Sequence, residues 1–84
     1  MMSLESLVTI VRDEADTIIN YNRLLENTDC AKCRRLIEHI IGEEFSHIGE
    51  CLYAISVIKP DYHDKVIDGQ AEAKEIFDAH EPML

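Results

Sequence analysis

The chain has 84 residues, enough for one domain (1–84), and its 17 Asp and Glu against 8 Lys and Arg give a formal net charge of −9. This acidic balance argues against nucleic acid as a partner, because binding to phosphate backbones relies on Lys and Arg. The N-terminus has no basic region followed by a long apolar one, and the apolar runs are too short to span a membrane, so we expect a cytoplasmic protein with no membrane partner.

The first predicted element is a helix from Leu4 to Leu25. Its core-facing residues recur at alternating intervals of three and four, which places them on one stripe of a helix. Positions 4, 7, 11, 14, 18, 21 and 25 of this stripe are Leu, Leu, Val, Glu, Ile, Tyr and Leu. Ser3 is suited to cap the helix, with Ser6 where a capping-box glutamate would stand.

The second predicted element is a longer helix from about Cys30 to Ile58. Asn27-Thr28-Asp29 separates it from the first helix, and Thr28 or Asp29 is suited to cap it. Positions 33, 37, 40, 44, 47, 51, 54 and 58 of its stripe are Cys, Ile, Ile, Glu, His, Cys, Ala and Ile. Four further apolar residues widen this face, as in a helical bundle: Ile41, Ile48, Leu52 and Ile55.

A third, shorter helix is predicted from about Asp61 to Ala79. Lys59-Pro60-Asp61 ends the second helix, because proline cannot continue it. The third helix has a sparse apolar face, and Gly69 is a point at which it can divide. Nothing in the sequence indicates a pair of strands. The predicted fold class is therefore all-α: an antiparallel helical hairpin followed by a short C-terminal helix.

Glu14 and Glu44 interrupt the apolar stripes of the two long helices. Each lies 15 residues from Asp29. At about 1.5 Å of rise per residue, both stand roughly 22 Å from the bend and therefore at the same level of the hairpin. His47 follows Glu44 at i, i+3, so the two side chains share a helix face and can hold one metal ion.

The sequence around these glutamates offers no basic side chain as a counter-charge. A buried carboxylate needs a positive partner or must take up a proton. No Lys or Arg occurs between Asp13 and Asn22, or between Leu36 and Ile58. We therefore predict a divalent cation between Glu14, Glu44 and His47. The alternatives are that both glutamates face solvent, or that a partner chain supplies a cation.

One hairpin offers only three ligands, which is half of a two-metal site. Di-iron sites in four-helix bundles use a Glu from each of two helices and a Glu-x-x-His from each of the other two. Two copies of the hairpin related by a two-fold axis supply that set. We therefore expect a homodimer or a higher homo-oligomer that forms a four-helix bundle with the metal between subunits. Imidazole and carboxylate suit iron or manganese, and do not exclude zinc.

Three features match one known family. Glu14 to Tyr21 has the Glu-x6-Tyr pattern of a first ligand helix, Glu43 to His47 has the Glu-Glu-x-x-His pattern of a second, and Asn27-Thr28-Asp29 lies in a short turn between them. Over roughly residues 5 to 65 the chain resembles the ferritin-like superfamily, and within it the short rubrerythrin-type and encapsulated-ferritin-type hairpins. The 30-residue separation of Glu14 and Glu44 also resembles the encapsulated ferritins.

The resemblance implies a di-iron carboxylate protein that binds and oxidises Fe(II), in other words a ferroxidase. It implies Glu14, Glu44 and His47 as iron ligands and catalytic residues, with Tyr21 close by in the catalytic site. It also places Asp13 and Asp16 where acidic residues guide iron inward, although ordinary solvated residues fit there as well. The alternatives are a rubrerythrin-like protein that reduces peroxide, and a non-catalytic helical assembly module with a structural metal.

The sequence departs from the family in three respects. Residues 78–84 show no Gly-Ser-Leu-type cargo tag, which argues against loading into an encapsulin shell. The four-cysteine ligation of a rubredoxin is absent, which argues against rubrerythrin-style electron delivery. The chain is also too short for a classical four-helix ferritin subunit, so we do not expect it to form a cage by itself.

Other residues leave alternatives open. Cys30-Ala31-Lys32-Cys33 suits a thiol redox pair or half of a zinc site, but we favour the interpretation that these thiols are incidental. The odd total of three cysteines does not suggest a disulfide framework, and Cys51 is expected to be a buried small hydrophobe.

Two more glutamates lie near the predicted site. Glu43 can pair with His47 at i, i+4 in place of Glu44, and Glu50 can serve as an extra ligand or as a hydrogen-bond acceptor for the imidazole. The remaining histidines, which lack a carboxylate cluster at a suitable spacing, are expected to be surface or packing residues: His39, His63 and His80.

Overall fold

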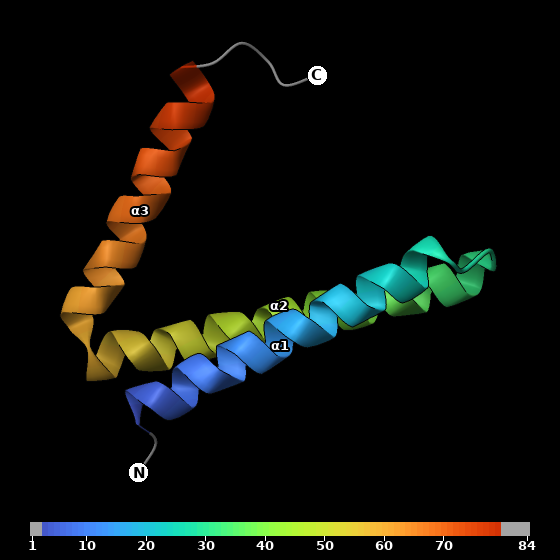
Figure 1. Ribbon diagram of the computed structural model, residues 1–84, viewed down its shortest axis with the longest axis horizontal. Helices are drawn as coiled ribbons and strands as arrows, with labels where there is room; N and C mark the ends of the chain where they lie inside the picture. Colours follow the sequence, from blue (N-terminus) through green and yellow to red (C-terminus); the bar gives the residue numbers. More distant parts are fainter. Residues whose placement is uncertain (1–2, 80–84) are drawn as a thin grey trace.

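The computed structural model describes residues 3–79, in which the chain forms three α-helices and no strand (Figure 1). Helix α1 spans Leu4–Glu26, α2 spans Ala31–Ile58 and α3 spans Pro60–Ala79. The all-α class and the three helices are thus confirmed. The sequence before and after this range, including His80 and most of the tail searched for a cargo tag, lies outside the described residues.

Helices α1 and α2 lie side by side and antiparallel, as the predicted hairpin requires (Figure 1). Ser3 caps α1 as expected, because its Oγ accepts the backbone N–H of Ser6 at 3.1 Å. The Ser6 hydroxyl lies 2.9 Å from the same oxygen. Ser6 thus stands where a capping-box glutamate would stand, but its side chain contacts the Ser3 hydroxyl.

The predicted cap of α2 is wrong, since Cys30 rather than Thr28 or Asp29 occupies the N-cap position. Thr28 instead donates its hydroxyl to the carbonyl of Leu24 at 2.6 Å, and Asn27 donates its amide to Arg23 at 2.8 Å. Both side chains bind carbonyls of the last turn of α1, and the Leu24 carbonyl also accepts the backbone N–H of Asn27 at 3.1 Å. The turn residues thus cap the end of the first helix, and the second helix begins at Ala31, one residue after the predicted start at Cys30.

Arg34 ties the start of α2 to the end of α1. Its Nη1 donates to the carbonyl of Leu25 at 2.5 Å and to that of Thr28 at 3.0 Å. Hydrogen bonds from a charged donor are worth about 1.5–3 kcal/mol. This bridge across the turn fixes how far α2 starts from the end of α1, and so fixes which residues of the two helices stand at the same level.

The face between α1 and α2 contains the buried residues Leu7, Ile37 and Ile55. All seven stripe positions predicted for α1 are buried or half-buried, which confirms that stripe. The stripe predicted for α2 is only partly correct, because Cys33, His47 and Ile58 are exposed while the four widening residues are buried or half-buried. Helix α2 is therefore turned toward the widening residues, and His47 lies at the edge of the contact.

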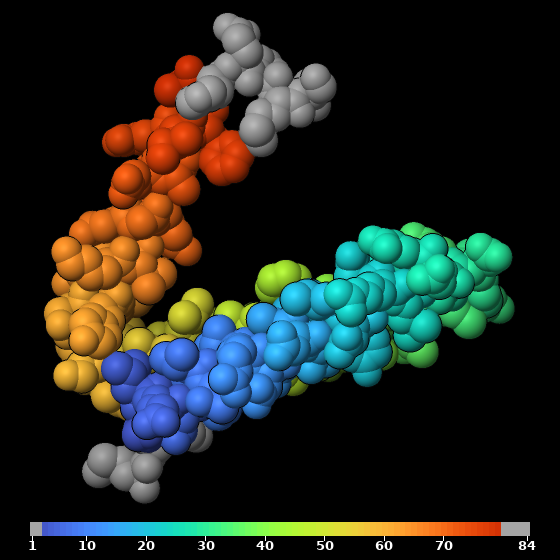
Figure 2. Space-filling view, viewed as in Figure 1, coloured from blue at the N-terminus to red at the C-terminus, as the bar shows by residue number. Residues whose placement is uncertain are grey.

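Helix α3 leaves the end of α2 at a bend and projects away from the hairpin (Figures 1 and 2). None of its residues is buried. An apolar hollow of about 360 Å³ lies where the three helices approach one another, lined by Leu4, Val8, Val11, Leu52, Ile55, Tyr62 and Val66. Within residues 3–79, no helix is long and apolar enough to cross a membrane.

Gly69 does not divide α3, which is continuous from Pro60 to Ala79. A glycine in a helix interior costs roughly 1 kcal/mol relative to alanine. The residues that follow it, Gln70-Ala71-Glu72-Ala73-Lys74, all have strong helix propensity and offset that cost.

Candidate metal centre

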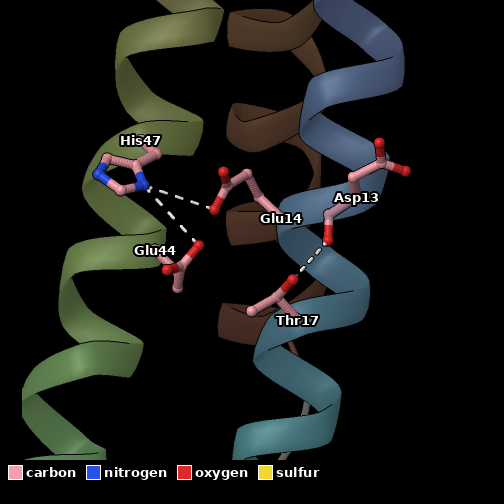
Figure 3. A network of polar contacts seen from close by, with 5 residues as sticks. All are labelled: Asp13, Glu14, Thr17, Glu44 and His47. Carbon is pink, nitrogen blue, oxygen red and sulfur yellow. Dashed lines mark hydrogen bonds and ion pairs between the residues drawn. The ribbon is translucent and has the colours of Figure 1, made fainter.

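Glu14, Glu44 and His47 meet halfway along the hairpin, with Glu14 on α1 and the other two on α2 (Figure 3). The Nδ1 atom of His47 lies 3.5 Å from Oε2 of Glu14 and 3.7 Å from Oε2 of Glu44. One potential ligand atom from each residue lies within 4.8 Å of the others. The predicted meeting of the three side chains is therefore confirmed, while their role as metal ligands stays a prediction.

Burial is uneven across this cluster, because both carboxylates turn inward and the imidazole lies at the edge. The side chains of Glu14 and Glu44 are 23% and 17% exposed, whereas that of His47 is 49% exposed. Helix α2 explains the difference, since its turn toward the widening residues moves Glu44 inward and His47 outward. The cluster is thus reachable from the His47 side.

Oε2 of Glu14 has less than 1 Å² of accessible surface and no hydrogen-bond partner among the described residues. Its 3.5 Å approach to His47 Nδ1 is an ion-pair distance and does not count as a hydrogen bond. A buried carboxylate oxygen without a partner is costly, and a bound cation would remove that cost. The residues present therefore fit a metal ion at this position.

No lysine or arginine neutralises the two carboxylates within residues 3–79. Arg12, the nearest basic residue in sequence, pairs with Asp13 at 3.6 Å on the exposed side of α1. His47 is the only basic partner of Glu14 and Glu44 there, and an imidazole is charged only when protonated. Two carboxylates balance the charge of a divalent cation, and a neutral imidazole leaves that balance unchanged.

The competing pairing of Glu43 with His47 is not observed. Glu43 lies instead 3.1 Å from Nε2 of His39, at i, i+4 on the exposed side of α2. Glu50 is exposed and lies outside the cluster. Among the carboxylates of α2, the geometry therefore selects Glu44, which lies on the stripe and opposite Glu14.

Tyr21 is half-buried on the same stripe as Glu14. It follows Glu14 by seven residues, which is about 10 Å along the helix axis. Asp13 and Asp16 are exposed, and the backbone carbonyl of Asp13 accepts the Thr17 hydroxyl at 3.0 Å. Asp13 and Asp16 therefore do not belong to the cluster, while the role of Tyr21 stays a prediction.

The three cysteines lie apart from the centre or at its margin. Cys30 and Cys33 are exposed at the turn, and Cys51 is half-buried. Cys30 precedes Glu44 by 14 residues, about 21 Å along α2.

His39 is exposed and His63 is half-buried, as expected for surface and packing residues.

Arg34 is the residue with a role in the site that sequence reasoning missed. It touches neither glutamate, yet its bridge across the turn holds them level. The only sign in the sequence is a basic residue one turn after the helix start. A basic residue there normally faces solvent, so that sign is weak.

Helix α3 meets the hairpin at an apolar hollow that His47 does not line. Leu52, which lines the apolar hollow beside α3, follows His47 by five residues and so points about 140° away from it around α2. The face of α2 that carries His47 also carries Leu36, Ile40, Ala54 and Ile58, at intervals of four and seven. Leu36 is 60% exposed there.

No protein-family model, curated protein or solved structure matches this chain. The interpretation of the centre rests on the geometry of its side chains.

Proposed function

We propose that this protein binds iron at Glu14, Glu44 and His47 and promotes the oxidation of Fe(II), in the manner of a ferritin-like di-iron protein. The observation that carries the proposal is the Oε2 atom of Glu14, which is shielded from solvent, lacks a hydrogen bond and faces a second carboxylate and an imidazole. A cation that binds all three side chains would satisfy this oxygen.

The donor set favours iron or manganese over other metals. Carboxylate and imidazole donors suit these ions, whereas thiolate-rich sets select zinc and iron–sulfur clusters. Iron as substrate would supply the change from Fe(II) to Fe(III), with dioxygen or peroxide as electron acceptor. Glu14 and Glu44 would hold the iron ion through that change, because a carboxylate binds both oxidation states. His47, which lies at the open side, would admit the ion.

A second copy of the chain would complete the centre. Three donors leave most positions of a metal ion unfilled, whereas two copies would supply four carboxylates and two imidazoles, the set used in four-helix-bundle di-iron sites. The open side of the hairpin supports this arrangement, because the exposed cluster edge at His47 lies between apolar residues of the same helix face, Leu36 and Ile40 on one side and Ala54 and Ile58 on the other. The proposed dimer buries that face around the metal.

The test is iron oxidation by the purified full-length protein. Fe(II) is added without oxygen, air is admitted, and the ferric absorbance is followed. The wild-type protein should oxidise Fe(II) faster than buffer, and Glu14→Gln and Glu44→Gln should lose the acceleration. Glu43→Gln is the matched control, because Glu43 neighbours Glu44 but pairs with His39, and it should keep the wild-type rate.

Two results would overturn the proposal. A wild-type rate equal to that of buffer would remove the oxidation, and an unchanged rate in both glutamine variants would remove these ligands. The subunit arrangement has its own measurement, the molar mass in solution by light scattering with and without Fe(II). A monomer under both conditions would exclude a centre shared between copies.

A structural metal is a second candidate, favoured by the small number of buried residues in the hairpin. A metal that joins two helices or two copies would add stability that the apolar core does not supply. This function predicts that a chelator lowers the melting temperature while Fe(II) oxidation stays at the buffer rate. An unchanged melting temperature after chelation would exclude it.

A further inference from the structure

Cys30 and Cys33 form a pair of thiols at the turn of the hairpin, far from the metal centre. Cys30 occupies the N-cap of α2, and its Sγ accepts the backbone N–H of Cys33 at 3.4 Å. Both residues are exposed and neither is in a disulfide. A dissolved molecule can therefore reach both sulfur atoms.

The spacing of the pair permits a disulfide bond within one chain. Residues at i and i+3 of a helix have Cα atoms about 5 Å apart, from the rise and radius of the helix. Disulfides usually join Cα atoms about 4.4–6.8 Å apart. Closing the bond therefore needs rotation of two side chains and little movement of the backbone.

The two thiols differ in ways that assign them different roles. The thiol of Cys33 and its backbone N–H both donate to the sulfur of Cys30, which lowers the pKa of Cys30. The same contact with Cys30 raises the pKa of Cys33. Because the thiolate is the nucleophile, Cys30 is the attacking residue and Cys33 the one that reacts second.

The charge around the pair differs from that of the rest of the chain. Lys32, Arg34 and Arg35 all lie in the first five residues of α2, in a chain whose net charge is −9. Arg34 is bound to turn carbonyls, whereas Lys32 and Arg35 are exposed and form no ion pair within residues 3–79. These two side chains favour a reactant that carries carboxylates, with Asp29 as the one acidic residue directly beside the pair.

We propose that Cys30 and Cys33 form a thiol–disulfide exchange site for small disulfides that carry carboxylates. The site is separate from the proposed iron centre and does not rest on it, since about 21 Å of helix lies between Cys30 and Glu44. The chemistry takes place between the two cysteine sulfur atoms and those of the small disulfide, without a metal ion.

The reaction balances with the small disulfide as the oxidant. The Cys30 thiolate attacks one sulfur of RSSR, which forms the mixed disulfide Cys30–S–S–R and releases RS⁻. The Cys33 thiol gives up its proton and attacks Sγ of Cys30, which forms the Cys30–Cys33 disulfide and releases the second RS⁻. The two RS⁻ groups take up the two protons lost by the cysteines. Two cysteine thiols are oxidised and one RSSR is reduced to two RSH.

The experiment uses glutathione disulfide as the probe and the reduced full-length protein in the presence of a chelator, so that iron takes no part. Products are identified by intact-protein mass and peptide mapping. The wild-type protein should lose two hydrogen atoms and join Cys30 to Cys33, without retaining glutathione. The variant Cys33→Ser should instead trap one glutathionyl group on Cys30, and Cys51→Ser should behave as wild type.

Reaction rates test the role of the charges. Lys32→Glu combined with Arg35→Glu should slow the reaction with glutathione disulfide several-fold relative to hydroxyethyl disulfide, which is uncharged. An equal slowing with both reagents would overturn the preference for carboxylates. Circular dichroism of each variant separates loss of reaction from loss of helix.

Three results would overturn the exchange site itself. One is a wild-type protein that accumulates glutathione on Cys30 or Cys33 without forming their disulfide. Another is a Cys30 that reacts no faster than Cys51. The third is a disulfide that links two chains in place of one, which non-reducing electrophoresis detects.

Discussion

Replacing Glu14 with glutamine tests the metal centre through stability, without any assay of activity. The variant keeps the shape of the side chain and removes its charge. The Glu14 side chain is 23% exposed, and its Oε2 atom lacks a hydrogen bond. An unsatisfied buried group costs about 1–3 kcal/mol, and more when charged. The glutamine amide still lacks partners, so we expect the metal-free variant to be more stable than wild type by about 1 kcal/mol.

Iron should reverse that order. A ligand that binds only the folded state stabilises it by about 2.7 kcal/mol at a concentration one hundred times its Kd. Glu14→Gln loses a ligand and gains much less. For a domain of this size about 1 kcal/mol moves the melting temperature by roughly 4–8 °C. Thermal unfolding is followed by circular dichroism under anaerobic conditions. The variant should have the higher melting temperature without Fe(II), and the wild-type protein should have the higher one with Fe(II).

Glu43→Gln provides the matched control for both conditions. Glu43 is 57% exposed and pairs with His39, so its replacement should change stability by no more than about 0.5 kcal/mol with or without Fe(II). A metal-free Glu14→Gln protein that is less stable than wild type, together with a wild-type melting temperature that Fe(II) does not move, would refute the reasoning. The Glu14 carboxylate would then not be a charge in need of a cation.

Three further predictions concern the core, the turn and the thiols. Leu7→Ala should cost about 2–5 kcal/mol in urea unfolding, because Leu7 is buried between α1 and α2, and a smaller loss would mean that the hairpin closes around the gap. Arg34→Ala should cost about 1.5–3 kcal/mol in the same assay, and Arg35→Ala, which removes an exposed side chain without these bonds, should cost less than about 0.5 kcal/mol. Alkylation by iodoacetamide should begin at lower pH for Cys30 than for Cys33. Hydrogen bonds from the Cys33 thiol and N–H lower the pKa of Cys30, so that Cys30 is a thiolate at a pH where Cys33 is still protonated. Peptide mass spectrometry across a pH series measures both onsets, and identical onsets would contradict the assigned roles.

The positions of the helices could be predicted because their signals are local. Alternating intervals of three and four define α1, and Pro60 separates α2 from α3. The level of Glu14 against Glu44 was also predictable, since both are equally far from Asp29 and a short turn allows little slippage. The meeting of the two glutamates could thus be predicted from the helical rise and the place of the bend, although the Arg34 bridge that holds the bend could not.

The cap of α2 could not be predicted, because the same turn residues had two possible uses. The hydroxyl of Thr28 can cap the next helix or bind the carbonyls of the previous one, and it binds Leu24. In the structure Arg34 binds the same turn from α2, by donating to the carbonyls of Leu25 and Thr28. That contact joins residues of different helices and has no periodic signature in the sequence.

The rotation of α2 about its own axis could not be predicted from the sequence either. Its apolar face is wider than one stripe, so two rotations bury nearly the same residues. Packing against α1 selects the one that brings Ile55 inside and leaves Cys33 and Ile58 exposed. The direction of α3 depends similarly on the single residue Lys59 between two helices, whose backbone angles no propensity specifies.

The rotation of α2 determines both how the site is exposed and where a second copy of the chain would dock. If α2 faced α1 along its predicted stripe, His47 would be enclosed and one chain would hold all three side chains apart from solvent. Instead the carboxylates are inside, the imidazole lies at the edge, and Leu36 and Ile58 on the same face of α2 are exposed. The positions that a bound metal ion would leave unfilled and these exposed apolar residues thus lie on the same side of the hairpin. A second copy docked there would complete both together, so in the proposed dimer iron binding and subunit association stabilise each other.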